Sequence, residues 1–463
     1  MQATTPQTSL TVYNGGFGLV KDVRVVELAA GRQTIPVPNV AAMIERDSVA
    51  VRSLSAPGSF EVMEQNFRYD LISPFAILQK SIGEEVTITQ VLANGTVARE
   101  EGTLLSAPVN EALAATNTGV TIRLKNGGVL LNPPGTIEVK KLPGDLVSKP
   151  TLFWDLDADK AGANTVELSY LTGGLSWIAN YVILLEDDGN SGSLKGWVTM
   201  NNTSGTSYVD CRLKLLAGEV NRSAPAKTPA DAGRFLREYK MKDHDMQEEQ
   251  FGEYHLYTLP RPATVLNNEM KQLSLLESPK IKIAKQIVFD PTLNYGSYRA
   301  SEGEIGTGSI KPLVKYTIVN AKASGLGMPL PAGTVKLYQR DSEGATQLVG
   351  EDSIDHTPAD ERISLDVGRA FDIVAQRNRS SYKRIVSGKK TIGATETFVT
   401  ELRNRKKVAE TVTLIERFYG DWKVTESTEK YTKANANAIV FTVTLKPGEV
   451  RKLTYSVETR WGS

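Results

Sequence analysis

Hydrophobic and polar residues alternate with a period of two along most of the chain, as at residues 137–139 (IEV) and 412–414 (VTL). Such alternation is typical of half-buried β-strands, and clusters of turn residues separate the alternating segments at short intervals. We therefore expect an all-β protein. It should consist of two or more β-sandwich (immunoglobulin-like) units, a small inserted β-barrel-like domain and one mobile charged loop.

The last alternating segments are residues 438–457, AIVFTVTLKPGEVRKLTYSV. Pro447 presets one dihedral angle of a turn, and Gly448 supplies the next. This pattern predicts a β-hairpin whose two strands are joined through Lys446–Glu449.

Changes in composition predict four segments. Residues 66–150 contain short strands separated by Gly-rich and Pro-rich turns, which favours a small barrel-like domain. Residues 221–251 open with proline and small residues and then become highly charged, which indicates a mobile insertion. The expected division is listed by residue: 1–65, N-terminal strands that join the sandwich region; 66–150, the inserted domain; 151–310, a sandwich that carries the insertion; and 311–463, a C-terminal sandwich.

A weak internal repeat runs through the second half of the chain. Residues 197–220, 315–339 and 398–418 each contain a strand, an asparagine, a polar turn and a second strand. Unrelated hairpins that share turn chemistry and a true duplication both remain open interpretations. Asparagine tolerates the left-handed conformation and bonds its own backbone, so the expected turn starters are Asn201 or Asn202, Asn320 and Asn404.

The densest apolar stretch is residues 166–187, VELSYLTGGLSWIANYVILLED, with Gly173-Gly174 at its centre. The two glycines allow a bend where a side chain would obstruct. We expect Trp177 and Tyr181 to fill a sandwich corner and bond to nearby backbone. The functional alternative makes these two residues ligand-binding candidates, an exposed platform that stacks on a sugar or peptide.

One cluster of acidic residues in the sequence suggests a metal-binding site. Asp155, Asp157 and Asp159 stand at alternate positions, a spacing that calcium loops use. However, Lys160 occupies the position where such a loop requires glycine, and Glu167 falls one place beyond the bidentate position. A polar strand-to-turn connection is therefore the preferred interpretation, and these aspartates are the calcium candidates.

Catalytic signatures are missing. The sequence has no G-x-S-x-G, P-loop or H-E-x-x-H motif, and the three histidines, His244, His255 and His356, show no metal-ligand spacing. A single cysteine, Cys211, excludes an intrachain disulfide, and its alternating neighbours place it in a core. We expect no enzymatic activity, no cofactor and no catalytic residue.

The balance of positive and negative residues limits the classes of partner that the chain could bind. Lys and Arg number 54 against 53 for Asp and Glu, so there is no global field to hold nucleic acid. No apolar run reaches the roughly 18 residues of a transmembrane segment. The polar start MQATTPQTSL suggests an initiator Met on a trimmed, exported protein. We therefore expect a periplasmic or extracellular location with the signal peptide removed, although a cytoplasmic one stays open.

Several segments resemble one family in order and number. They are YLTGGLSWIANYVILL, GWVTMNNTSGTSYVDCRLKLLAGEVNR, YTLPRPATVLNNEMKQLSLLE, PLPAGTVKLYQRDSEGATQLVGEDSIDHTPADERISLDVGRAFDIV and FVTELRNRKKVAETVTLIERFYGDWKV. They are similar to the uncharacterised β-rich bacterial proteins related to mucoidy inhibitor A, across most of residues 150–463. The resemblance implies an exported β-sandwich protein with no established activity. Where better-known members carry a coiled coil, this chain has residues 66–150.

Two functions follow as hypotheses. The first is a non-enzymatic envelope or surface protein, a β-sandwich scaffold that binds an unidentified protein or cell-envelope component and self-associates through sheet edges. The second is a carbohydrate-binding or carbohydrate-processing protein with aromatic platforms. The residues of that alternative are Trp154, Trp177, Trp197 or Trp422 with nearby acids such as Asp155 or Asp421.

Overall fold

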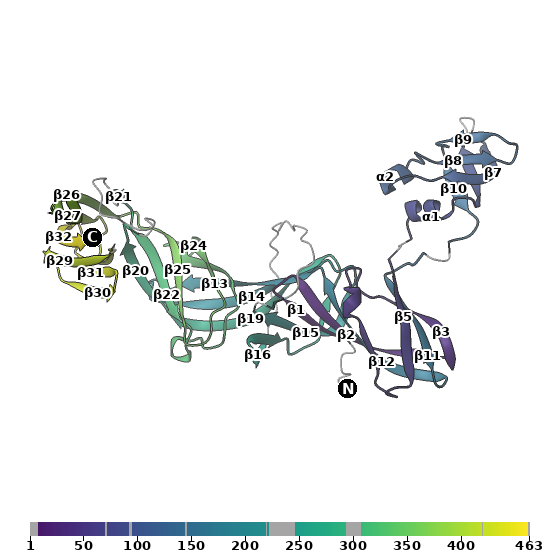
Figure 1. Cartoon of the computed structure of the whole chain (residues 1–463), viewed down its shortest axis with the longest axis horizontal. Helices are drawn as coiled ribbons and strands as arrows, with labels where there is room; N and C mark the ends of the chain where they lie inside the picture. The colour runs from purple at the N-terminus through teal and green to yellow at the C-terminus, as the bar shows by residue number, and fades with distance from the viewer. Residues whose placement is uncertain are drawn as a thin grey trace. The chain divides into compact units, whose positions relative to one another are not determined.

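The expected all-β class is confirmed. A computed structural model of the chain consists mainly of strands, and the described part contains two α-helices, both short (Figure 1). Neither is long and apolar enough to cross a membrane. Most of the predicted mobile insertion lies outside the described residues, which are 8–69, 72–91, 95–143, 146–218, 220–221, 246–292, 307–418 and 420–461.

The chain forms two compact units. Several strands run through both, because the boundaries fall inside them. The first unit contains Met1–Trp177, Met200–Val220 and Thr258–Lys271, and the second contains Ile178–Thr199, Asn221–Tyr257 and Gln272–Ser463.

The first unit contains a large sheet that the N-terminal strands enter. β1 pairs in parallel with β15 and antiparallel with β2, so residues about two hundred positions apart become neighbours. A smaller sheet has the order β3-β11-β5. The strands that this unit contributes to the large sheet, in order, are β15 (Tyr208–Ala217), β1 (Thr8–Tyr13), β2 (Phe17–Leu28), β12 (Gly162–Gly173) and β4 (Ala50–Ser53), with β18 (Ala263–Val265) beside β15; those of the small sheet are β3 (Gly31–Pro38), β11 (Thr151–Ala158) and β5 (Phe60–Arg68).

The region expected to be barrel-like is an open five-stranded sheet. Its edge strands, β10 and β9, do not pair with each other, so the described strands form no closed barrel. Helix α1 (Pro74–Lys80) explains why closure is unnecessary, because its buried Leu78 joins the apolar core of the sheet. The sheet has the order β10 (Thr136–Val139), β6 (Glu85–Val91), β7 (Val97–Ser106), β8 (Thr121–Leu124) and β9 (Val129–Leu131), and α2 (Glu111–Ala114) follows β7.

The second unit contains three larger sheets and a hairpin. The first sheet has the order β19 (Glu269–Lys282), β14 (Ser191–Asn202), β13 (Leu175–Leu185), β23 (Gly333–Arg340) and β24 (Thr346–Ile354). The second has β25 (Arg362–Arg369), β22 (Leu313–Val319), β20 (Ala284–Phe289), β28 (Glu410–Arg417), β31 (Ala438–Leu445) and β30 (Tyr431–Asn435). The third has β21 (Gly308–Ile310), β26 (Ile373–Ser387), β27 (Lys390–Asn404), β32 (Val450–Arg460) and β29 (Asp421–Ser427), and the hairpin is β16 (Gln247–Phe251) with β17 (Tyr254–Thr258).

The expected hairpin at residues 438–457 is wrong. The turn forms, with Gly448 at φ 73°, but β31 pairs in one sheet and β32 in another. The reason is that both strands direct their apolar residues, such as Phe441 and Tyr455, into one core between the two sheets. The segment is therefore an arch that crosses the core.

The weak sequence repeat corresponds to a repeated structure. In each copy a strand ends at or next to an asparagine, crosses to a second strand in another sheet, and a later arch brings the chain back beside the first strand. We call each such place an Asn corner. The strands in equivalent order are β14, β15, β18 and β19; β22, β23, β24 and β25; and β27, β28, β31 and β32.

The three corner asparagines make equivalent contacts. Each is fully buried, and each side-chain amide donates to two consecutive carbonyls of the returning arch. Each side-chain oxygen accepts a backbone N–H within its own arch, at 2.9–3.1 Å. The bonded carbonyls are those of Val265 and Leu266 for Asn202, Thr357 and Pro358 for Asn320, and Leu445 and Lys446 for Asn404.

The returning arches also share one backbone conformation. Two positions after the second bonded carbonyl, each arch has a residue in the left-handed region: Asn268 at φ 58°, Asp360 at φ 65° and Gly448 at φ 73°. These residue types tolerate that region better than most. The same contacts at the same spacing favour duplication over unrelated turns.

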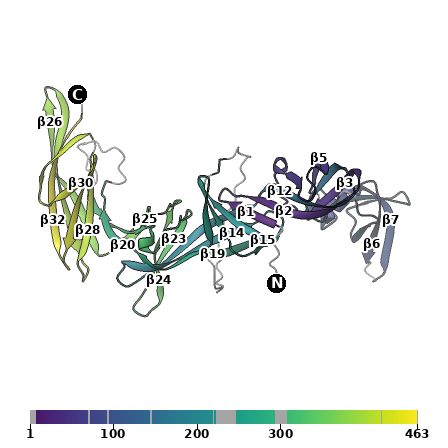
Figure 2. The same ribbon diagram turned by 90° about the horizontal axis from the view of Figure 1, so that it is seen from below.

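Parallel strand pairs link successive copies. β13, which precedes the first corner, pairs in parallel with β23 of the second copy, and β20 pairs in parallel with β28 of the third. Neighbouring copies therefore share a sheet. Figure 2 shows β20 beside β28 where this shared sheet forms.

Candidate functional site

Trp177 and Tyr181 belong to the core. Their exposed fractions are 2% and 1%. The Trp177 Nε1 donates to the Val12 carbonyl at 3.0 Å, and the Tyr181 hydroxyl donates to the Pro331 carbonyl at 2.8 Å. Burial raises the pKa of Tyr181 well above its ordinary value, as expected for a phenol held inside a protein. In this structure neither ring offers a face on which a ligand could stack.

The glycine pair beside them acts as the expected bend. Gly173 ends β12 and Gly174 precedes β13, which lies in a different sheet. Gly174 has φ 75°, and a Cβ there would lie 2.8 Å from the Ser204 nitrogen. A larger residue would therefore be both strained and crowded.

The other tryptophans named for a carbohydrate platform differ in exposure. Trp154 is fully buried, whereas Trp197 and Trp422 are half-buried. The Trp422 ring packs against Phe418 at 4.8 Å between centroids, and the Lys433 ammonium lies 4.7 Å from the Trp422 centroid. The Trp422 indole N–H donates to a backbone carbonyl at 2.9 Å. Trp422 is thus already engaged by its own sandwich.

The three aspartates do not surround a common centre. Asp155 and Asp157 are on strand β11, where residues two apart lie about 6.6 Å apart along an extended chain. The Asp155 carboxylate accepts a hydrogen bond from Thr34, and Asp159 follows the end of the strand. Among the described residues, no three His, Cys, Asp or Glu side chains form a group that could hold a metal ion.

The remaining reactive side chains are occupied locally. The His255 Nδ1 lies 2.8 Å from the Glu248 carboxylate, and the His356 Nδ1 accepts the Ala332 N–H at 3.2 Å. His244 lies outside the described residues. Cys211 is buried, and burial raises the pKa of its thiol to about 12, which suppresses the reactive thiolate.

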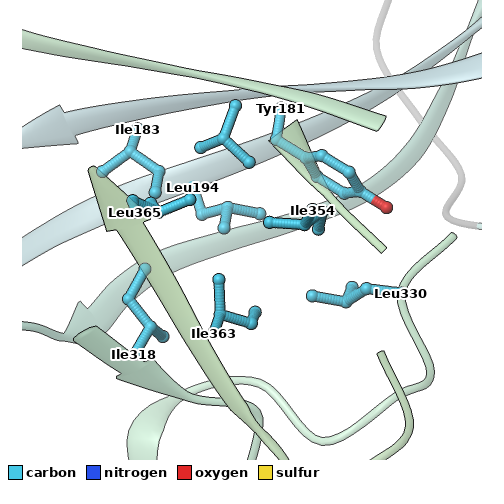
Figure 3. A pocket seen from close by; sticks show the side chains of 9 residues that line it. Tyr181, Ile183, Leu194, Ile318, Leu330, Ile354, Ile363 and Leu365 are labelled. Carbon is cyan, nitrogen blue, oxygen red and sulfur yellow. The ribbon is translucent and has the colours of Figure 1, made fainter. Parts of the chain in front are cut away.

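A small cavity lies within one sandwich (Figure 3). Its volume is about 10 Å³, near the least that can hold one water molecule. The lining is aliphatic apart from Tyr181, whose hydroxyl is bonded to backbone. The cavity is a gap in core packing, lined by Tyr181, Ile183, Leu194, Ile318, Leu330, Val335, Ile354, Ile363 and Leu365.

A buried ionic network lies in the inner half of the β26–β27 hairpin. Arg377 forms two 2.9 Å hydrogen bonds to the Glu416 carboxylate and donates a third to the Tyr455 hydroxyl at 3.1 Å. The Phe398 ring covers the guanidinium, 3.8 Å from its centroid. Burial opposes the charge, but the Glu416 carboxylate and Tyr455 outweigh it, so the pKa of Arg377 is raised. Arg379 similarly bonds Glu396 at 2.8 Å.

The outer half of the same hairpin is exposed and basic. From Tyr382 to Thr395 the sequence contains four Lys or Arg residues and no Asp or Glu, a run that the sequence-based predictions did not include. We define the hairpin tip as residues 383–392. Its exposed side chains are Lys383, Arg384, Val386, Ser387, Lys389 and Lys390.

Comparison with known proteins does not assign the chain: no protein-family model matches it, and no curated protein matches it. The likeness to proteins related to mucoidy inhibitor A therefore remains an expectation from the sequence.

Proposed function

We propose that the chain is a non-enzymatic protein of the bacterial envelope or surface, a β-sandwich scaffold that holds exposed loops and sheet edges for another macromolecule. The observation that carries this proposal is where the buried polar side chains of the protein form their bonds. The corner asparagines and the Arg377–Glu416 pair are buried and bonded within the sandwiches, where they serve the fold.

Exposed features supply the interaction surfaces of such a scaffold. Strand β24 lies at the edge of its sheet, and its first residues, 346–349, are exposed, with Leu348 at 55%. An edge strand with exposed side chains can accept an added strand, which makes it suited to a protein partner or to self-association.

The test is capture from a native envelope extract by the immobilised full chain. An unrelated β-sandwich protein of similar size serves as the control. Specific retention of the same component in repeated experiments supports the scaffold. Repeated failure to retain any component, together with monomeric behaviour in sedimentation, argues against it.

The carbohydrate alternative is tested separately by iodide quenching of tryptophan fluorescence with a panel of envelope glycans. Because Trp154 and Trp177 are buried, only the half-buried indoles can respond. If the chain is a scaffold for a protein partner, no glycan should protect its tryptophans from quenching by iodide. Saturable protection at Trp422 would replace it with a glycan-binding function.

A further inference from the structure

The hairpin tip projects beyond the strand that supports it. β26 and β27 remain paired as far as Ser387 and Lys390, whereas β27 pairs with β32 only from Gly393 onward. Gly388, at φ 63°, makes the turn. In Figure 2 this part of the protein lies near the C-terminus, and the Trp461 N–H bonds the Ile392 carbonyl at 3.1 Å.

The charges of the three tip lysines are not neutralised by nearby acids of the described chain. Glu396, the nearest acid after the tip, bonds Arg379, and Glu458 on β32 bonds Arg460 at 2.7 Å. Lys383, Lys389 and Lys390 are exposed, and none forms an ion pair with the described residues. The tip therefore presents a concentrated positive charge on a chain whose net charge is only +1.

The side chains next to the tip lysines indicate which class of anionic ligand the tip would bind. The Val386 side chain is 63% exposed beside these lysines. Tyr382, the only aromatic residue from Arg379 to Thr391, lies under the Arg379 guanidinium at 4.8 Å, so a base or sugar ring finds an obstructed face for stacking. Lysines beside an exposed aliphatic residue match a bilayer surface, where phosphates meet acyl chains.

We propose that the hairpin tip binds the surface of a bilayer containing anionic lipids. Lys383, Lys389 and Lys390 lie at the phosphate headgroups, and Val386 enters the boundary with the acyl chains. This inference rests on the proposed scaffold function and deepens it by naming the surface to which the scaffold attaches. The capture experiment above can fail while this binding succeeds, and the reverse also holds.

The first test measures sedimentation of the full chain with vesicles. Vesicles of phosphatidylcholine mixed with phosphatidylglycerol should bind it, and vesicles of phosphatidylcholine alone should not. Replacing Lys383, Lys389 and Lys390 by Gln should weaken binding on the order of 100-fold, since each basic residue contributes about 1 kcal/mol near an anionic surface. The matched control replaces Lys160, Lys280 and Lys430, three exposed lysines elsewhere, and should bind as the unaltered chain does.

The second test locates Val386. A Val386→Trp variant, confirmed as folded by circular dichroism, should show extra fluorescence that brominated lipids quench, whereas the unaltered chain should not show this quenching.

Three results would overturn the proposal: equal binding to both kinds of vesicle, equal losses in the two triple variants, or binding to heparin or single-stranded DNA without binding to vesicles. The last outcome would identify a soluble polyanion as the ligand.

Discussion

Basic residues have opposite roles in the two halves of the β26–β27 hairpin. In the inner half, Arg377 is 2% exposed and bonded to Glu416. In the outer half, Lys389 and Lys390 are exposed and face no nearby carboxylate partner among the described residues. A buried cation needs a group of opposite charge beside it within the protein. An exposed cation contributes little to stability and remains available for a partner. Burial therefore separates structural charge from interaction charge within one hairpin.

The largest effect should come from breaking the buried pair. Glu416→Gln leaves the Arg377 guanidinium buried without its carboxylate and should lower the free energy of unfolding by about 3–5 kcal/mol. Urea unfolding measures it. The paired replacement Arg377→Met with Glu416→Leu should recover most of the loss, because it removes both charges together. A loss below about 1 kcal/mol for Glu416→Gln would show that this inner charge is not structural.

Cys211 extends the comparison to a buried nucleophile in the first unit. Because the pKa of its thiol is raised to about 12, iodoacetamide should label the native protein at pH 8 about 1,000-fold more slowly than the unfolded chain. The thiol is protonated when buried, so its contribution to stability is intact below about pH 8.5 and falls as the pH rises toward 12. Labelling of the native chain at the rate of a free thiol would contradict this burial.

The corner asparagines sharpen the comparison between inner and outer polar groups. Asn404→Ala removes donors from three carbonyls and should lower the free energy of unfolding by about 2–3 kcal/mol. Asn202→Ala and Asn320→Ala should cost similar amounts, which urea unfolding can compare directly. The control is Asn435→Ala, an exposed asparagine at the end of β30 with one backbone contact, which should change stability by less than about 0.5 kcal/mol. Unequal losses at the three corners would mean that equivalent contacts are not equivalent in energy.

The smallest effect on stability should come from the hairpin tip. Replacing Lys383, Lys389 and Lys390 by Gln should change the free energy of unfolding by less than about 0.5 kcal/mol, because exposed side chains without partners contribute little. Thermal unfolding, monitored by circular dichroism, checks this expectation. A large loss would place these lysines with the inner half and remove the distinction between the halves.

Local pattern predicted the strands but not how they assemble. Alternation around Phe441 and Tyr455 identified two strands, and Pro447-Gly448 identified their turn. Turn chemistry is the same for a hairpin and an arch, so the sequence could not show that these strands pair in different sheets. What distinguishes the two is the shared core on which both strands pack, and that core includes residues from elsewhere in the chain.

The candidate sites were likewise predictable only where the local sequence pattern was sufficient. A core position was expected for Trp177 and Tyr181 beside Gly173-Gly174, and the structure places both there. Arg377 was not recognised, because a charged residue in an alternating strand resembles an exposed one until its partner is known. That partner, Glu416, lies 39 positions away. The acid-free run at the hairpin tip was visible in the sequence, but its exposure was not.

The parallel pairing between strands remote in sequence has a consequence for protein synthesis. The Ser9 hydroxyl bonds the carbonyl of Arg212, 203 positions later, so β1 leaves the ribosome long before its neighbour β15 exists. The same delay recurs for β13, which waits for β23, and for β20, which waits for β28. Nascent chains with such delayed closure expose unpaired edges and fold slowly. The growing polypeptide should therefore depend on chaperones for most of its translation, and a truncated product should aggregate through the edge that lacks its neighbour.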